Sequence, residues 1–304
     1  MKRFIIQCFL FIGLLVSLFT VVEYRLRHIP TNYTCKEARI QTIKHQIETL
    51  VLGPCYAVQD INPSYFDTYT YNASQHGQTL KFDAYLFQRY CSQMTHLKRF
   101  ILPISYFTYY AKSDLFSVVR NINYVYACDY SAYHWTDFEH RYKTFWIDQN
   151  KDFIKNMFGL SDYITVDSLG FETPKKENVD ISLWQNRMDQ VVKQRNNVED
   201  TVALKINLNY LNEIILQCES KDIRLYLVFL PQSSVFLSRV DQQQLQNTFS
   251  ITDSVSSNYP NVYFLNYVND KRFNDSDFFD VNHLHPKGAE KFSRLLNDTI
   301  SFLY

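Results

Sequence analysis

Short runs of consecutive apolar residues alternate with longer amphipathic stretches along most of this chain. The amphipathic stretches carry apolar residues at helical spacing, and they cover 78–91, 204–218, 237–255 and the segment after Pro286. Strands that are buried on both faces read as continuous apolar runs, and joining them in parallel requires crossover connections. The pattern therefore predicts an α/β fold: a three-layer α/β/α sandwich around a mainly parallel sheet. The predicted strands are 47–53, 69–72, 98–105 (ending at Pro103), 223–230 and 261–267.

The first apolar run is of a different kind. Lys2 and Arg3 precede an uncharged run from Phe4 to Val22, which as a helix reaches about 30 Å, enough to cross a bilayer core. No small-x-small cleavage site follows it, which favours an uncleaved signal anchor over 1–27. A polar connector over 28–46, helical near 36–45, would then lead to a body outside the cytoplasm. Basic charge flanks both ends of the run, so the reverse orientation is the alternative.

The strand–helix alternation is interrupted between Tyr106 and about Asn197. The interruption is too long for a loop of a compact domain, so we expect an insertion over 106–197 with its own helices, inside an α/β domain that spans 47–304. Its first part is rich in aromatic residues. Such residues either stack on sugars or form an aromatic local core.

Charge and cysteine content exclude some classes of function. Lys plus Arg and Asp plus Glu both number 31, so the net charge is zero and no basic field for nucleic acid is expected. Of the 6 cysteines, Cys8 lies in the apolar run and five lie outside it. An odd number leaves at least one thiol unpaired in a monomer, and no spacing suggests a zinc site. Neither a metal nor a cofactor is implied.

The end of the first predicted strand presents a cysteine. The apolar run stops at Gly53 and Pro54, and Cys55 follows. Ligands of open parallel sheets bind beyond the carboxyl ends of the strands. A neighbouring imidazolium or a helix N-terminus there can lower the pKa of a thiol from about 8.5 into the range of a reactive thiolate. The alternative is a buried, inert cysteine at a strand end.

An acid and an imidazole precede the last predicted helix, in the segment DVNHLHPKG. Asp280 and His283 are three residues apart, so a turn can bring both side chains to one side, where the carboxylate would hold the imidazole in one tautomer. The alternative is an Asp–His pair that caps the helix. His285 is the rival base, and it could instead serve as a cap or a substrate contact.

Asn72 follows the short second strand, in the segment YNASQHGQ. Its amide N–H₂ could donate to a developing oxyanion, or Asn72 could cap a helix. Asn72 also opens an N-x-S sequon, and Asn32, Asn274 and Asn297 open N-x-S/T sequons, although a glycan on Asn72 would be incompatible with a catalytic role.

These segments in this order resemble the SGNH/GDSL hydrolase superfamily, and in particular its membrane-anchored bacterial members linked to acyl transfer at the cell surface. LVLGPCYAVQDINPSYF is similar to the strand-plus-nucleophile block, YNASQHGQ to the oxyanion block, LKRFILPISYF to the third strand and DVNHLHPKGAEKFS to the closing D-x-x-H block. The resemblance implies a flavodoxin-like sheet. It implies Cys55 as nucleophile, His283 and Asp280 as its partners, and Asn72 with the main-chain N–H of Cys55 as oxyanion donors. Tyr56 and His285 would then lie at the substrate.

The chain departs from the family because cysteine replaces the nucleophilic serine. A Cys–His pair could form a thioester, which makes the expected function an esterase or acyltransferase for acyl, chiefly acetyl, esters of cell-surface glycans. The alternative is an inactive pseudoenzyme that binds a glycan or assists assembly, and Pro54, which lacks an N–H, favours it. A papain-like protease fits poorly, because its cysteine precedes a β-rich lobe. The expected partners are an acylated glycan or acyl donor and the membrane.

Overall fold

The computed structural model describes residues 1–111, 118–130, 141–142, 165–173, 184, 188–189, 192 and 200–303. Its centre is a sheet of five parallel strands in the order β2-β1-β3-β4-β5, which confirms the predicted α/β class. The strands occupy the apolar runs of the sequence, although β1 is shorter than predicted. They are β1 (Thr49–Val51), β2 (Thr70–Asn72), β3 (Arg99–Ile104), β4 (Arg224–Phe229) and β5 (Val262–Asn266).

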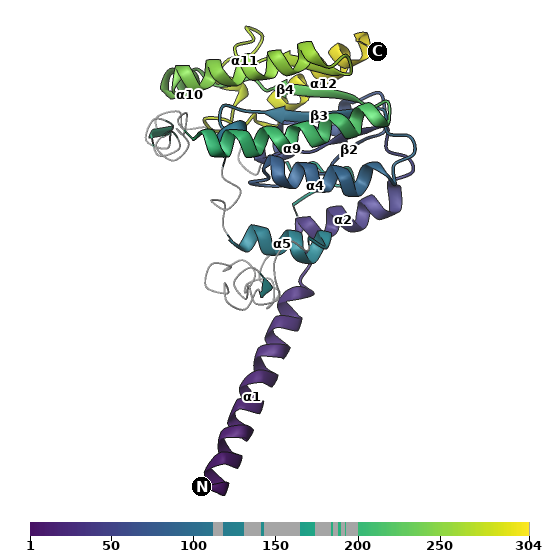
Figure 1. Cartoon of the computed structure of the whole chain (residues 1–304). Coiled ribbons are helices and arrows are strands. Elements are labelled where there is room, and N and C mark those ends of the chain that lie inside the picture. Colours follow the sequence, from purple (N-terminus) through teal and green to yellow (C-terminus); the bar gives the residue numbers. More distant parts are fainter. Residues whose placement is uncertain are drawn as a thin grey trace. The chain divides into compact units, whose positions relative to one another are not determined.

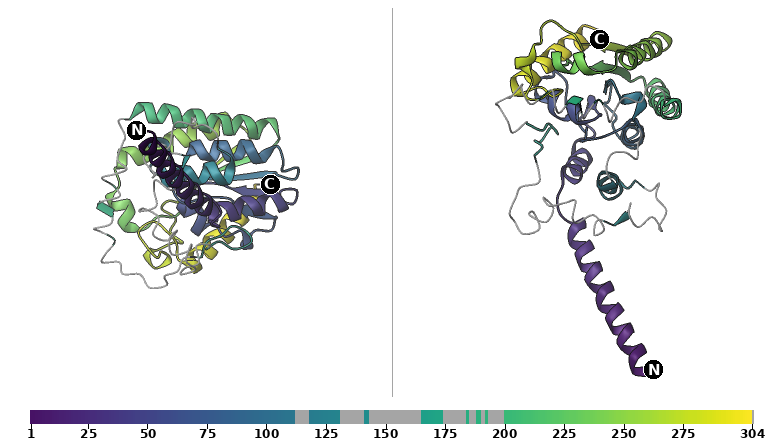
Figure 2. Two further views of the ribbon diagram at one scale, coloured as in Figure 1. Left: turned by 90° about the horizontal axis from the view of Figure 1, so that it is seen from below. Right: turned by 90° about the vertical axis from the view of Figure 1, so that its left-hand side faces the viewer.

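Helices cover both faces of this sheet. One layer contains α4 (Leu80–Cys91), α9 (Thr201–Ser220) and α11 (Gln242–Asn258), and the opposite layer contains α3 (Cys55–Asp60) and α12 (Pro286–Phe302) (Figures 1 and 2). The chain steps from β2 to β3, β4 and β5 in one direction, so right-handed crossovers place their helices on the same face. Short 3₁₀ helices lie at Pro63–Tyr65, Thr108–Tyr110 and Asp275–Asp277.

The predicted helix over 237–255 is divided in two by side-chain caps. The helix α10 (Ser234–Arg239) starts at Ser233, whose hydroxyl accepts the N–H of Phe236 at 3.1 Å. The helix α11 starts at Asp241, whose carboxylate accepts the N–H of Gln244 at 2.8 Å. Each acceptor satisfies one of the N–H groups that a helix start leaves without a partner.

Pro103 lies inside β3 and does not end it, contrary to the prediction. The residue pairs with Val228 of β4, and the strand continues to Ile104. The other neighbour, β1, ends at Val51, which pairs with Ile101. Pro103 therefore lies beyond the end of β1, where its missing N–H interrupts no ladder on that side.

Contacts divide the chain into two compact units. The sheet and its helices belong to the unit formed by 39–115 and 166–304, and the other unit is formed by 1–38 and 116–165. The predicted insertion over 106–197 is described only in part: the described residues include the 3₁₀ helix Thr108–Tyr110, α5 (Val118–Cys128) and the bridge Val166–Glu172.

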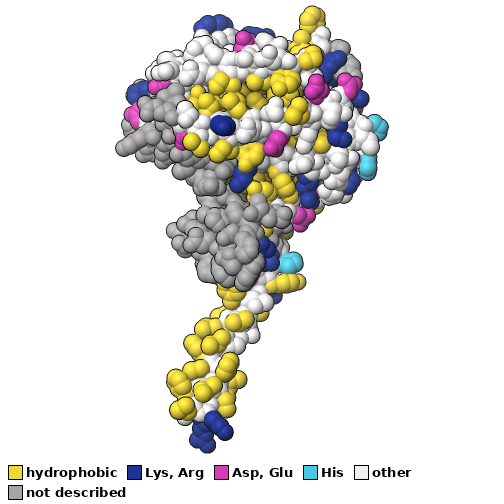
Figure 3. Space-filling model, viewed as in Figure 1, with side chains coloured by type: hydrophobic (Ala, Val, Ile, Leu, Met, Phe, Trp, Pro, Cys, Tyr) yellow, Lys and Arg dark blue, Asp and Glu magenta, His cyan; other side chains and the backbone are white. Residues whose placement is uncertain are grey.

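The predicted apolar segment forms the long helix α1 (Lys2–Arg27), and the connector forms α2 (Asn32–Ile43). By length and composition α1 could cross a membrane, since its apolar window has a mean hydropathy of 2.6 and is not buried by the protein. Hydrophobic side chains cover it along its length (Figure 3). A helix of this kind serves either as a signal anchor or as a signal sequence.

Candidate active site

Cys55 is the first residue of α3, immediately beyond the carboxyl end of β1. The turn between them depends on Gly53, whose φ of +133° disfavours any residue with a side chain. A Cβ there would lie 3.1 Å from the ring of Pro103 and 3.2 Å from Ala57. Pro54 occupies the N-cap position with extended backbone, so its missing N–H costs no helical hydrogen bond. The chain thus places the thiol at the edge of the sheet where a ligand can approach.

Asp280 holds His283 through one carboxylate oxygen. Oδ1 of Asp280 lies 2.9 Å from Nδ1 of His283, and it accepts the main-chain N–H groups of Asn282 and His283 at 3.0 Å each. Both side chains are buried. The three-residue spacing therefore forms a local turn that orients the imidazole, and neither side chain caps α12.

The other nitrogen of His283, Nε2, is buried and makes no hydrogen bond of ordinary geometry within the described residues. The ring interacts instead with the charge of Cys55. Burial is the largest influence on each group and opposes its charged form. Nevertheless the pKa of Cys55 falls well below its ordinary value because His283 and His76 stabilise the thiolate. The pKa of His283 rises well above its ordinary value because Cys55 and Asp280 stabilise the imidazolium. The site therefore favours a thiolate–imidazolium pair.

A second imidazole, that of His76, interacts with the same thiol, and it was not predicted from the sequence. His76 Nε2 lies 2.7 Å from Oε2 of Glu172, and the ring interacts electrostatically with Cys55. Burial lowers the pKa of His76, but these two partners raise it to about 9. His76 belongs to the YNASQHGQ segment, so its position beyond a strand end was a usable signal. Glu172 lies within the predicted insertion, where no sequence pattern indicated a role for it.

Asp60, at the end of α3, adds a buried carboxyl group. Its Oδ1 accepts the N–H of Leu284 at 2.9 Å, and its Oδ2 has no hydrogen-bond partner within the described residues. Burial raises the pKa of Asp60 well above its ordinary value, against the favourable charge of His283. This upward shift disfavours a third negative charge beside the thiolate and Asp280.

Asn72 does not have a free amide for an oxyanion, contrary to the expectation. Its Nδ2 donates to the carbonyls of Ala57 at 2.6 Å and Ile61 at 2.9 Å, and its Oδ1 accepts the N–H of Ser74 at 3.1 Å. Both amide hydrogens are used, and the residue is fully buried. Asn72 thus ties α3 to β2 and positions Cys55 indirectly.

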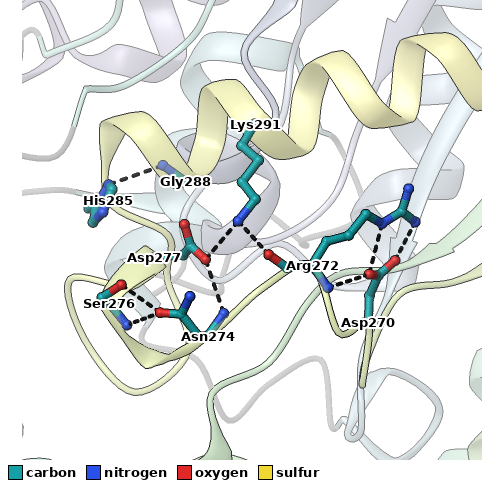
Figure 4. Close-up of polar contacts among 8 residues, drawn as sticks. All are labelled: Asp270, Arg272, Asn274, Ser276, Asp277, His285, Gly288 and Lys291. Carbon is teal, nitrogen blue, oxygen red and sulfur yellow. Dashed lines mark hydrogen bonds and ion pairs between the residues drawn. The ribbon is translucent and has the colours of Figure 1, made fainter.

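His285 caps α12, which is one of the three roles that the sequence left open for it (base, cap or substrate contact). Its Nδ1 accepts the N–H of Gly288 at 3.0 Å (Figure 4). The loop before it is held by Asp277, whose Oδ2 accepts the N–H of Asn274 and the ammonium of Lys291, both at 3.0 Å (Figure 4). Tyr56 is buried, with its ring edge-on to Phe107 at 6.3 Å.

The arrangement supplies a nucleophilic sulfur and two imidazoles, each supported by a carboxylate. Of the main-chain N–H groups that start α3, those of Ala57 and Val58 bond to Pro54, whereas Cys55 has no acceptor within the helix. That N–H can donate to an oxygen that gains charge during attack on a carbonyl. In the described part of the chain no group of three or more His, Cys, Asp or Glu side chains is arranged to hold a metal ion.

The chain was compared with family models, with curated proteins and with solved structures. No family model matches it, and no curated protein matches it. Among solved structures, a Streptococcus pneumoniae protein named for platelet activating factor is 12% identical over 97% of this chain and 99% of its own, with a TM-score of 0.45. A Bacteroides fragilis protein named as an acylhydrolase is 10% identical over 84% of this chain and 86% of its own, with a TM-score of 0.41. These likenesses are too distant to carry an argument about function, so the chain is identified by its own coordinates as a parallel five-stranded α/β protein with a long apolar N-terminal helix.

Proposed function

We propose that this protein is an SGNH-like esterase or acyltransferase that acts on acyl, chiefly acetyl, esters of cell-surface glycans. The observation that carries the proposal is that Asp280 orients His283 and that His283 interacts with the thiol of Cys55. These residues meet although 225 to 228 positions of chain separate the cysteine from the other two. The apolar helix α1 supports attachment to a membrane as a signal anchor, with the α/β body outside the cytoplasm.

In the proposed first step the Cys55 thiolate attacks the ester carbonyl carbon. A C–S bond forms, and the carbonyl oxygen gains a negative charge that the N–H of Cys55 stabilises. When the intermediate collapses, the C–O bond to the alcohol breaks, and the imidazolium of His283 gives its proton to the departing oxygen. Cys55 is then a thioester, and His283 is neutral.

In the second step neutral His283 takes a proton from water or from a sugar hydroxyl. The oxygen attacks the thioester carbonyl, the C–S bond breaks, and the thiolate returns beside the imidazolium. Asp280 keeps Nδ1 protonated throughout, so that Nε2 is the nitrogen that exchanges the proton. Water as acceptor makes the protein an esterase, and a sugar hydroxyl makes it an acyltransferase.

The test uses the full chain in detergent micelles with a chromogenic acetyl ester. We expect wild type to release the alcohol and to carry an acetyl group on the tryptic peptide 45–81, whose only cysteine is Cys55. Cys55→Ala should abolish both signals. Cys35→Ala is the matched control, because Cys35 is a partly exposed thiol whose pKa is raised by burial, and it should leave both unchanged.

Two outcomes would contradict this proposal. Full turnover by Cys55→Ala would show that another residue is the nucleophile. If wild type neither turns over acetyl esters nor becomes acetylated, but retains a glycan in a binding assay, the protein belongs to the alternative class of inactive glycan-binding or assembly proteins.

A further inference from the structure

The loop that carries His76 is fixed alongside the turn that carries Cys55. The N–H of Ala73 donates to the carbonyl of Val51 at 2.8 Å, and the N–H of Gln75 donates to that of Gly53 at 3.1 Å. These main-chain bonds continue the pairing of β2 with β1 past the ends of both strands. The position of His76 next to the sulfur is therefore imposed by the sheet itself.

Glu172, which supports His76, is fixed to the same region from another part of the chain. Its N–H donates to the carbonyl of Val58 in α3 at 3.2 Å. The turn before it is closed by Asp167, whose carboxylate accepts the N–H groups of Leu169 and Phe171 at 2.8 and 3.0 Å. The Glu172 side chain is only 15% exposed, so its charge is poorly screened where it meets His76. The His76–Glu172 pair thus repeats, from different elements, the relationship of His283 to Asp280.

We propose that His76, braced by Glu172, is a further catalytic residue: its imidazolium is a second cationic partner of the Cys55 thiolate, in addition to that of His283. A catalytic role for His76 rests on the proposed function, whereas the position of His76 relative to Cys55 does not depend on the substrate. A nucleophile held in this way is charged before any substrate arrives, so attack requires no prior transfer of the thiol proton.

The charge balance around the sulfur leaves a role for a second imidazolium. The titratable groups that influence Cys55 or its two histidines from the described elements are His76, His283, Asp60, Asp280 and Glu172. Asp280 and Glu172 each pair with one imidazole, and burial raises the pKa of Asp60, which disfavours a further negative charge there. Cys55 is partly buried, and burial opposes the charged form of its thiol, so an unpaired thiolate there would be unfavourable. A second imidazolium offsets part of that cost, and its side chain is 40% exposed against 10% for His283, so it can take its proton from solvent.

The experiment measures the ionisation of Cys55 directly. Full-length protein in detergent is treated with iodoacetamide across pH 5–10, and alkylation is quantified on the tryptic peptide 45–81. We expect His76→Gln to move the midpoint of the profile to higher pH and to reduce the rate near pH 6 by about tenfold, since only the thiolate reacts. Near pH 10, where the thiol is ionised in both proteins, the two rates should converge. A variant that merely altered access to Cys55 would lose rate equally at both pH values.

Two further variants keep the result interpretable. Glu172→Gln retains a hydrogen-bonding side chain but removes the charge, and it should shift the profile in the same direction by a smaller amount. His45→Gln is the matched control, because His45 is exposed and precedes β1 at the opposite end of the strand from Cys55. Its profile should overlay that of wild type. Cys91 and Cys218 are buried, so their protection from alkylation reports that each variant is folded.

The inference is overturned if folded His76→Gln and Glu172→Gln both give the wild-type profile. It is equally overturned if His76→Gln lowers the rate by the same factor at pH 6 and pH 10. Failure of the proposed function is a separate outcome. If the protein has no acetyl-ester activity, the alkylation profiles still test the role of His76, because iodoacetamide reacts with the thiolate without any ester.

Discussion

The carboxylate of Asp280 meets Nδ1 of His283 at 2.9 Å and, through the same oxygen, holds the main-chain N–H of that histidine at 3.0 Å. One oxygen therefore fixes both the turn and the imidazole. The orientation of the ring towards Cys55 depends on a contact formed between residues only three apart.

Asp280→Asn should separate the electrostatic role of this contact from its structural role. The amide oxygen can still accept the main-chain N–H groups, so we expect the melting temperature to change little. Without the negative charge, the imidazolium of His283 is less stable, and kcat/KM for an acetyl ester should fall by a factor on the order of 10³–10⁴. Wild-type kcat/KM in a folded Asp280→Asn protein would contradict the assignment of His283 as the base.

Asn72→Asp tests whether Asn72 is structural. The substitution keeps the shape and Oδ1, but it turns both donors that meet the carbonyls of Ala57 and Ile61 into an acceptor. We expect the free energy of unfolding to fall by about 2–4 kcal/mol, measured by chemical denaturation. If Asn72 were instead an oxyanion donor, kcat would fall while the free energy of unfolding stayed close to that of wild type.

Gly170→Ala should loosen the segment that carries Glu172. Gly170 has a φ of +83°, and an added Cβ would collide with the main-chain carbonyl of Asn72. We expect a loss of about 1–3 kcal/mol in the free energy of unfolding and a shift of the Cys55 alkylation profile to higher pH. Gly13→Ala is the control, because nothing lies within 4 Å of its added Cβ. An unchanged melt and profile for Gly170→Ala would show that the segment lies elsewhere.

Asp83 should make the stability of the α/β body depend on pH. Burial raises its pKa to about 7, against the lowering effect of its 2.6 Å hydrogen bond from Gln78. Because the folded pKa exceeds the unfolded value of 3.8, the folded state binds more protons in between, and stability falls as pH rises from about 4 to 7. The full loss approaches roughly 4 kcal/mol.

Asp83→Asn removes this titration. Thermal melts should show that the variant gains stability relative to wild type at pH 8 and shows no such gain at pH 4. A difference between the two proteins that is the same at both pH values would contradict the raised pKa.

His285 should be replaceable by another capping residue. His285→Ala removes the acceptor of the Gly288 N–H and should cost about 1 kcal/mol of stability, whereas His285→Asn should restore most of it. Ester turnover should be similar in both variants once they are folded. A large loss of turnover in His285→Asn with an unchanged melting temperature would instead indicate that the ring contacts substrate.

Local patterns determined much of this protein. The runs that became β1 to β5 and the helical stripes of α4, α9 and α12 were readable because burial on a sheet or a helix face imposes a fixed spacing on apolar residues. The contact between Asp280 and His283 could also be predicted, because a single turn of the chain forms it. The end of β3 could not be predicted, because whether a proline ends a strand depends on where the neighbouring strand ends.

The residues that surround Cys55 were determined only by the tertiary structure. His76 and Glu172 are 96 positions apart, and nothing in either local sequence indicates that they meet. Asn72 was a plausible donor until folding directed both of its hydrogens to the carbonyls of α3. Burial raises the pKa of the Asp60 carboxyl, whose Oδ1 accepts the N–H of Leu284 from a segment 224 positions away. A side chain's charge and hydrogen-bond partners depend on everything packed around it, and that environment is set by contacts between distant segments.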